Sequence, residues 1–467
     1  MKKLFLLISF PMIFMISARA RVSLPAIFGD HMVLQQQSEV TVWGWADPIE
    51  GIAVSVSWDT AVARTKTDNY ARWMVTIKTQ AAGGPYTVTI AGNDTIILHN
   101  VMIGEVWLCS GQSNMEMSAA WGINNAEREI KEANYPNIRL FQVTKQAATD
   151  KQIDLSGSWA VCTPASMKNF SATGYFFGRK LNKELNIPIG LINSSWGGTA
   201  AETWINPEVI AGNGELSEAT RKISDTAPWC PGKPGSTYNS MIYPILNFRI
   251  AGVIWYQGET NTANAESYTD IFSALIKDWR TEFNKNLPFY YVQIAPYPYG
   301  RSFEGALVRE AQSKCLSVPN TGMVVISDIG NLKDIHPKDK QDVGLRLANW
   351  ALANTYDQQG ISFSGPVYRE MKISKNKVTL YFDFAEHGLV ARDGSLTGFQ
   401  VAGSDKIFVD AGAKIDGSTV IVSSPKVKEP VAVRFAFTNT SEPNLFNVEG
   451  LPASCFRTDD WPVELKK

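Results

Sequence analysis

Ser113 and His336 are the residues whose types and positions best suit nucleophilic chemistry. Ser113 follows the apolar run from Glu105 to Cys109 and comes directly after Gly111 and Gln112. A serine on a tight turn at the carboxyl end of a strand lies near helix-terminal N–H groups, which can stabilise an oxyanion. Its hydroxyl still needs a base before it can attack a carbonyl carbon.

Few side chains can serve as that base. The histidines of the chain are His31, His99, His336 and His387. Only His336 shares the central part of the chain with Ser113, and it lies in a loop between a predicted strand and a predicted helix. We therefore predict that His336 accepts the proton of Ser113.

A carboxylate should orient the imidazole of His336. Asp334, two residues earlier, is the nearest candidate, and only a bend in the chain would let it reach the ring. Asp328 and Glu259 remain as alternatives. The sequence leaves the choice among these three open.

Two more apolar runs end in groups that can donate hydrogen bonds. One is followed by Gly197 and Gly198, whose backbone N–H groups can approach a substrate oxygen without hindrance from a Cβ atom. The other is followed by Gln257, whose amide is a candidate side-chain donor. Each of these groups is a candidate donor to a developing oxyanion.

The elements that must position these residues alternate between strand and helix from residue 101 to 360. Apolar runs predict strands at 105–109, 190–196, 252–257, 289–294 and 323–328, and amphipathic stretches predict helices at 172–185, 265–283, 303–316 and 340–356. Such alternation predicts an α/β fold with a parallel sheet covered on both faces. Ligands of such sheets bind beyond the carboxyl ends of the strands.

Both ends of the mature chain have the period-two pattern of β-strands. The pattern covers residues 21–100, for instance at 39–43 and 86–90, and returns over 361–467, for instance at 378–384 and 431–437. The first region is predicted to be a β-sandwich. The second either forms a separate sandwich or completes the first one.

Residues 1–20 have the features of a signal peptide. Lys2 and Lys3 precede an apolar run to Ile16, and Ala18-Arg19-Ala20 fits a cleavage site. We expect export across the inner membrane, a periplasmic location, and no membrane insertion after cleavage, since no second apolar run is long enough to span a bilayer.

Net charge and cysteine spacing limit the classes of partner and cofactor that we expect. Among 467 residues, 44 basic and 45 acidic side chains give a net charge of −1, which does not favour nucleic acid or an anionic membrane surface. A small molecule or glycan is the expected partner. The cysteines (Cys109, Cys162, Cys230, Cys315 and Cys455) are scattered and imply neither a disulfide framework nor a zinc site. No metal or organic cofactor is expected.

Taken together, the segments resemble the sialate O-acetylesterase family of SGNH (GDSL-type) serine hydrolases. The matching motifs are Gly111-Gln-Ser-Asn114, Ser195-Trp-Gly-Gly-Thr199, Trp255-Tyr-Gln-Gly-Glu-Thr-Asn261 and Asp334-Ile-His-Pro337, with further likeness at 28–35 and 444–459. The resemblance implies a flavodoxin-like catalytic domain and an esterase that removes acetyl groups from a sugar, with sialic acid acetylated at O9 as the first candidate.

The resemblance also implies residue roles. Ser113 attacks the acetyl carbonyl, His336 relays the proton, and Ser113, Gly197 or Gly198, and Gln257 stabilise the oxyanion. One position departs from the general SGNH pattern, which has its acid three residues before the histidine, where this chain has Lys333. A Ser–His pair assisted by backbone or by Glu259 is therefore an alternative to a triad with Asp334. The side chains expected to line the substrate pocket are Gln112, Asn114, Trp196, Glu259 and Asn261.

Other readings of the same residues remain open. The substrate could be an acetylated polysaccharide such as xylan, or the chain could bind glycans without catalysis. Paired carboxylates such as Glu116 and Glu259 would instead suit a glycosidase. Arg309 is one cation that could meet the carboxylate of sialic acid, and its alternative is a surface pairing with Glu304 or Glu310.

Overall fold

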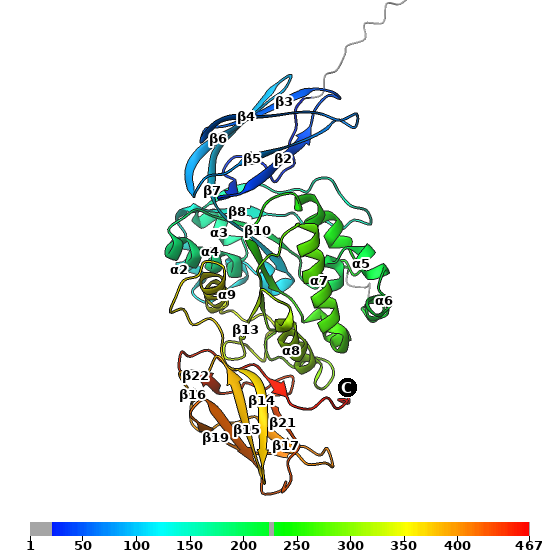
Figure 1. Cartoon of the computed structure of the whole chain (residues 1–467), viewed down its shortest axis with the longest axis vertical. Helices are drawn as coiled ribbons and strands as arrows, with labels where there is room; N and C mark the ends of the chain where they lie inside the picture. The colour runs from blue at the N-terminus through cyan, green and yellow to red at the C-terminus, as the bar shows by residue number, and fades with distance from the viewer. Residues whose placement is uncertain (1–20, 224–227, 467) are drawn as a thin grey trace, which may run out of the picture.

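Strand β7 (Thr95–Gly111) connects two parts of the molecule in the computed structural model, which describes residues 21–223 and 228–466. Its first half pairs with β6 (Gly83–Ala91) and β1 (Val33–Gln35), and its second half pairs with strands of the central sheet. The N-terminal β-rich region is thus joined to the α/β region through one continuous strand (Figure 1).

The central sheet has the strand order β13-β12-β11-β7-β10-β8-β9. All neighbouring pairs are parallel except β8 and β9. The bounds of the remaining strands are β8 (Tyr135–Gln142), β9 (Trp159–Cys162), β10 (Ile189–Ser195), β11 (Gly252–Tyr256), β12 (Phe289–Val292) and β13 (Thr321–Val324). The carboxyl ends of six strands therefore meet at one edge, as the alternation of strand and helix predicts.

Helices cover both faces of this sheet. Successive residues of β7 point into different cores on the two faces of the sheet. Leu108 belongs to the core with α7 (Tyr268–Glu282) and α8 (Glu304–Lys314). Trp107 belongs to the core with α4 (Ala172–Leu185) and α9 (Lys340–Asn354). Shorter helices lie between them: α1 (Ser113–Glu116), α2 (Ala126–Lys131), α3 (Pro164–Lys168), α5 (Pro207–Ala211) and α6 (Gly214–Thr220). The predicted fold class is confirmed.

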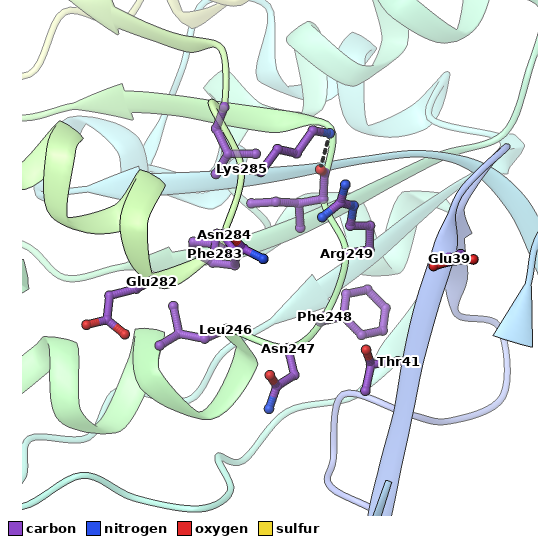
Figure 2. A pocket seen from close by; sticks show the side chains of 12 residues that line it. Glu39, Thr41, Leu246, Asn247, Phe248, Arg249, Glu282, Phe283, Asn284 and Lys285 are labelled. Atoms are coloured by element: carbon purple, nitrogen blue, oxygen red, sulfur yellow. Dashed lines mark hydrogen bonds between the residues drawn. The ribbon is translucent and has the colours of Figure 1, made fainter. Parts of the chain in front are cut away.

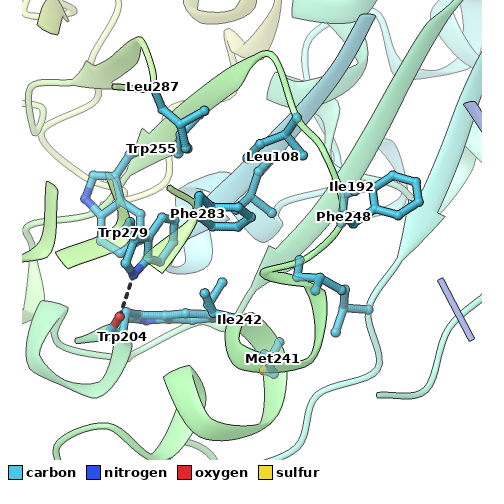
Figure 3. Close-up of a cluster of buried hydrophobic side chains, with 14 of the residues drawn as sticks. Leu108, Ile192, Trp204, Met241, Ile242, Phe248, Trp255, Trp279, Phe283 and Leu287 are labelled. Carbon is cyan, nitrogen blue, oxygen red and sulfur yellow. Dashed lines mark hydrogen bonds between the residues drawn. The ribbon is translucent and has the colours of Figure 1, made fainter. Parts of the chain in front are cut away.

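The core on the α7 side is rich in large aromatic rings (Figure 3). Trp255 of β11 packs edge-on against Trp204 and Trp279, and the Trp279 indole N–H donates to the Trp204 carbonyl at 2.8 Å. The same core continues through Phe248 and Phe28 to Trp43 in the N-terminal region. These two parts of the chain therefore share one hydrophobic core.

The N-terminal region is a sandwich of two small sheets. One consists of β2 (Glu39–Trp45) and β5 (Arg72–Lys78). The other contains β1, β3 (Gly51–Val56), β4 (Asp59–Lys66), β6 and the start of β7, and it is continuous with the central sheet through β7.

The C-terminal strands form separate antiparallel sheets with their own core. Those sheets have the orders β14-β15-β20-β19, β18-β17-β21-β23 and β16-β22. Their strands are β14 (Val367–Ser374), β15 (Lys377–Asp383), β16 (Leu389–Ala391), β17 (Phe399–Ala402), β18 (Val409–Asp410), β19 (Gly412–Asp416), β20 (Thr419–Ser423), β21 (Ala432–Phe435), β22 (Leu445–Asn447) and β23 (Phe456–Arg457). Figure 1 shows the two β-rich regions at opposite ends of the molecule. The alternative in which they complete one sandwich is wrong, because the α/β region lies between them.

The predicted signal segment, residues 1–20, lies outside the described residues. Within the described parts of the chain, none of the helices has the length and apolar character needed to cross a membrane.

Candidate active site

Ser113 and His336 meet at the carboxyl edge of the central sheet. Ser113 begins α1 one residue after the end of β7, and His336 lies in the loop between β13 and α9. The Oγ atom of Ser113 is 2.9 Å from Nε2 of His336, although the two residues are 223 positions apart. This is hydrogen-bond distance, as a nucleophile and its base require.

Asp334 lies next to His336 but binds its backbone more closely than its ring. The backbone N–H of His336 donates to Oδ1 of Asp334 at 2.9 Å, whereas Nδ1 is 3.4 Å from the same oxygen. The side chain of Asp334 is 42% exposed. The expected bend therefore exists, and it brings the carboxylate near the imidazole at a distance longer than a good hydrogen bond.

Neither of the other two candidates for the triad acid is hydrogen-bonded to His336 in the part of the chain that the structure describes. Asp328 forms a two-pronged ion pair with Arg346, with both N–O distances at 2.7 Å. Glu259 accepts a hydrogen bond from Nδ2 of Asn114 at 2.6 Å. Asp328 is therefore a structural residue.

A buried polar network lies behind the serine. Lys340, which is 0% exposed, donates from Nζ to Oδ1 of Asn114 at 2.5 Å, and Asn114 donates in turn to Glu259. Burial lowers the pKa of Lys340 to about 7, although the Glu259 carboxylate opposes the shift, and burial raises the pKa of Glu259. Burial and the nearby Lys340 also lower the pKa of His336, while Asp334 acts in the opposite direction. The lowered pKa favours the neutral imidazole, which is the form that acts as a general base.

The glycines predicted for the oxyanion hole lie beside the nucleophile. Gly197 is so close that a Cβ atom on it would stand 3.2 Å from Cβ of Ser113. Its N–H donates to Oε2 of Glu116 at 2.6 Å, and the other oxygen of Glu116 pairs with Lys145. Gly198, with φ of +81°, lines the same cavity.

Gln257 does not reach the serine. Its Nε2 donates to Oδ1 of Asn261 at 2.7 Å and to the Thr199 carbonyl at 3.3 Å, and its Oε1 accepts from Tyr268 at 2.8 Å. Both amide hydrogens are thus used inside the protein. Asn261 is likewise committed, since it donates to Glu202 at 2.8 Å. Neither side chain is among those lining the cavity.

Gln112, unlike Gln257, lines the cavity that contains Ser113. Its Oε1 accepts from the backbone N–H groups of Gly258 and Thr260 at 3.3 and 3.4 Å, and the side chain lines the cavity beside Ser113. Two N–H donors fix which end of the amide is the oxygen.

The cavity over the serine has a volume of about 500 Å³. It is lined by Gln112, Ser113, Glu116, Trp121, Lys145, Trp196, Gly197, Gly198, Trp229, Glu259, Thr260, Ile335 and His336. Three of these residues are tryptophans, whereas Asn114 is not among them and belongs to the buried network.

Arg309 neither lines the catalytic cavity nor pairs on the surface with Glu304 or Glu310. It is 2% exposed, and its guanidinium donates to the backbone carbonyl of Thr438 in the C-terminal region. Glu310 instead pairs with Arg457, and Glu304 pairs with Arg301. Arg309 thus joins two regions of the chain.

Comparison with known proteins identifies the family. The family model described as "Carbohydrate esterase, sialic acid-specific acetylesterase" matches residues 103–353, which contain Ser113 and His336. The chain belongs to this family. This carbohydrate esterase is 31% identical over 420 residues to the sialate O-acetylesterase of Mus musculus, covering 76% of this chain and 77% of that protein. It is 32% identical over 386 residues to the Homo sapiens sialate O-acetylesterase, covering 74% and 73%.

A solved structure supports the same assignment. The crystal structure of a carbohydrate acetylesterase from Xanthomonas citri superposes with a TM-score of 0.87 at 39% identity, covering 94% of this esterase and 100% of that chain. The protein is a carboxylic ester hydrolase that acts on acetylated carbohydrate.

Proposed function

We propose that this esterase hydrolyses acetyl esters through an acetyl-enzyme formed on Ser113, and that acetylated sialic acid is its substrate. The observation that carries the mechanism is the 2.9 Å contact between Ser113 Oγ and His336 Nε2 in a cavity walled by tryptophan. The sialate O-acetylesterases that match this chain support the choice of substrate.

Acylation begins when His336 Nε2 takes the hydroxyl proton as Ser113 Oγ bonds to the acetyl carbon. The tetrahedral intermediate then breaks its bond to the sugar oxygen, which receives the proton from His336. Water repeats the sequence: His336 takes a proton from it, the new hydroxide attacks the acetyl carbon, and the Ser113 ester bond breaks. Acetate leaves and Ser113 regains its proton.

The oxyanion needs donors that point to it throughout these steps. We propose the N–H groups of Ser113 and Gly198 together with Nε2 of Gln112. Gln112 is suited to this role because its oxygen is anchored on Gly258 and Thr260. Gly197 is less suited, because its N–H is bonded to Glu116.

Replacement of the nucleophile tests the mechanism. Ser113→Ala should reduce acetate release by at least about 10⁴-fold and leave the fold intact. Ser317→Ala, a change at an exposed serine on another part of the surface, is the matched control. Turnover by purified Ser113→Ala at the wild-type rate would exclude the mechanism.

A neutral acetylated polysaccharide is the second candidate substrate, because the carbohydrate acetylesterase from Xanthomonas citri is 39% identical over nearly the whole chain. Acetate release should be compared between sialic acid acetylated at O9 and acetylated xylan. Release from xylan alone would select the second candidate.

We also propose that the protein is exported to the periplasm, on the basis of the leader pattern in residues 1–20. Cell fractionation of the full chain, with the N-terminus of the recovered protein sequenced, tests this. Recovery of the protein in the cytoplasmic fraction with Lys2 and Lys3 still present would contradict the proposal.

A further inference from the structure

Two adjoining cavities lie at the edge of the central sheet opposite to Ser113. Segment 243–250 leads into β11 and segment 282–287 leads into β12, so both cavities border the amino ends of these strands. Their volumes are about 180 and 530 Å³, and they share Leu246, Asn247 and Glu282. Figure 2 shows the smaller one. We call the two together the amino-edge groove.

One wall of the amino-edge groove is a single face of β2. Glu39, Thr41, Trp43 and Trp45 alternate along this strand and all line the groove. At about 3.3 Å per residue, their span is roughly 20 Å. The opposite wall comes from the α/β region. An elongated trough of this kind suits a chain-like ligand better than a compact one.

Aromatic rings and amides line the larger cavity together. Trp45 and Tyr243 are half-buried, and Gln152 and Asn247 offer amide groups beside them. Trp73 also lines it, is 3% exposed, and has an indole N–H that finds no hydrogen-bond partner within the described parts of the chain. A sugar ring has apolar C–H faces and a rim of hydroxyls, so rings and amides in one cavity match it.

The charges of the groove are mixed in sign and partly neutralised within the protein. Nε of Arg72 donates to Asp68 at 3.1 Å, Nζ of Lys285 donates to the Ile250 carbonyl at 3.0 Å, and Glu282 accepts from Asn206 at 3.1 Å. The remaining charged lining residues are Glu39, Lys66 and Arg249. Since neither sign dominates, the groove favours a neutral ligand over a nucleic acid or an acidic polymer.

We propose that the amino-edge groove binds a neutral polysaccharide chain and so retains the esterase on that polymer. This site is separate from the catalytic cavity, because it lies at the other ends of the strands. It does not depend on whether sialic acid or another sugar is cleaved at Ser113.

Affinity electrophoresis of the whole chain tests this proposal with soluble arabinoxylan, galactomannan and hydroxyethylcellulose. The polymers are used in deacetylated form, so that hydrolysis at Ser113 cannot contribute to the retardation. We expect at least one of them to retard the wild type. Trp45→Ala should weaken that binding roughly tenfold, as expected for the loss of one desolvated aromatic contact. Asn247→Arg should do the same by obstructing the groove, and because Asn247 is exposed the fold should tolerate the change.

Tyr381→Ala is the control, an aromatic-to-alanine change in the C-terminal region, and it should bind as the wild type does. Hydrolysis of 4-nitrophenyl acetate should stay within about twofold of wild type in all three variants, since the small ester needs only the catalytic cavity. Retardation by none of the polymers, equal retardation of wild type and Asn247→Arg, or preferential binding of polysialic acid would each overturn the proposal. A failure of the Ser113 mechanism would instead appear in the ester assay of Ser113→Ala.

Discussion

The two edges of the central sheet are built from the same strands but present different surfaces. At the carboxyl edge, Lys340, Asn114 and Glu259 are buried and bonded to one another before any substrate arrives. At the amino edge, Trp45 and Tyr243 are half-exposed along an open groove. Burying polar groups costs free energy unless their partners are in place, so such a network is expected where orientation matters for chemistry.

This difference predicts two kinetic signatures. Changes at the carboxyl edge should lower kcat for every ester, because they alter groups that act on the transition state. Changes at the amino edge should weaken retention on a polymer and leave kcat for a small ester intact.

The largest effect among these tests is expected at Gln112. Gln112→Leu removes the proposed side-chain donor to the oxyanion and should lower kcat by about 10²–10³-fold with little change in KM. Gln257→Leu is the informative contrast, because its amide is part of a buried hydrogen-bond network. Its loss should lower the melting temperature and reduce kcat less than Gln112→Leu does. A larger kcat loss in Gln257→Leu than in Gln112→Leu would restore Gln257 as the donor.

Lys340 should have an intermediate effect. Lys340→Met leaves Asn114 without its donor and Glu259 without a nearby cation, and we expect kcat/KM to fall by about 10–100-fold. Lys338→Met, an exposed lysine two residues away, is the control and should act as wild type. Thermal unfolding of both variants separates a loss of activity from a loss of fold.

The pH profile of the same pair sharpens this test. His336 acts as a base only when neutral, and its pKa is lowered from the usual 6.5 by burial and by Lys340. Wild-type kcat/KM should therefore persist below pH 6.5 and fall only as the pH drops through the lowered value. Removing the positive charge raises the pKa of His336, so the acid limb of Lys340→Met should move to higher pH. An unchanged acid limb would show that Lys340 does not act on the imidazole.

The sequence predicts the parts of the site that depend on strand order alone. Ser113 and His336 follow different predicted strands of one parallel sheet, and parallel strands bring their carboxyl ends together. The sequence does not indicate that Lys340 is buried in the site, because a lysine in the first turn of a helix is normally solvated. Its burial depends on how α9 packs against the segment that follows β7. The choice between Gln112 and Gln257 was hidden for a similar reason, since side-chain direction after a strand depends on tertiary partners such as Tyr268.

The same limit applies at the opposite edge and in the tail. The period-two pattern over 39–43 predicts a strand in which Trp43 and Thr41 share a face, but the wall opposite them comes from residues about 200 positions later. Whether the C-terminal strands complete the first sandwich also depended on long-range packing. Local pattern therefore indicated the elements, and the grooves between them required the folded chain.

Among the residues tested at the carboxyl edge, Asp334 should lower kcat/KM least when it is replaced, although it is the acid of the expected triad. Its carboxylate lies 3.4 Å from Nδ1 and is 42% exposed, so water screens its interaction with the imidazole. Asp334→Asn keeps an oxygen that can accept the His336 backbone N–H, and we expect kcat/KM to fall by less than about tenfold. Asp339→Asn, the neighbouring cap of α9, controls for the loss of one charge. A loss near 10⁴-fold in Asp334→Asn would show that this carboxylate closes on the imidazole during catalysis, as in a full triad. The ranking of effects would then follow contact with His336 rather than burial.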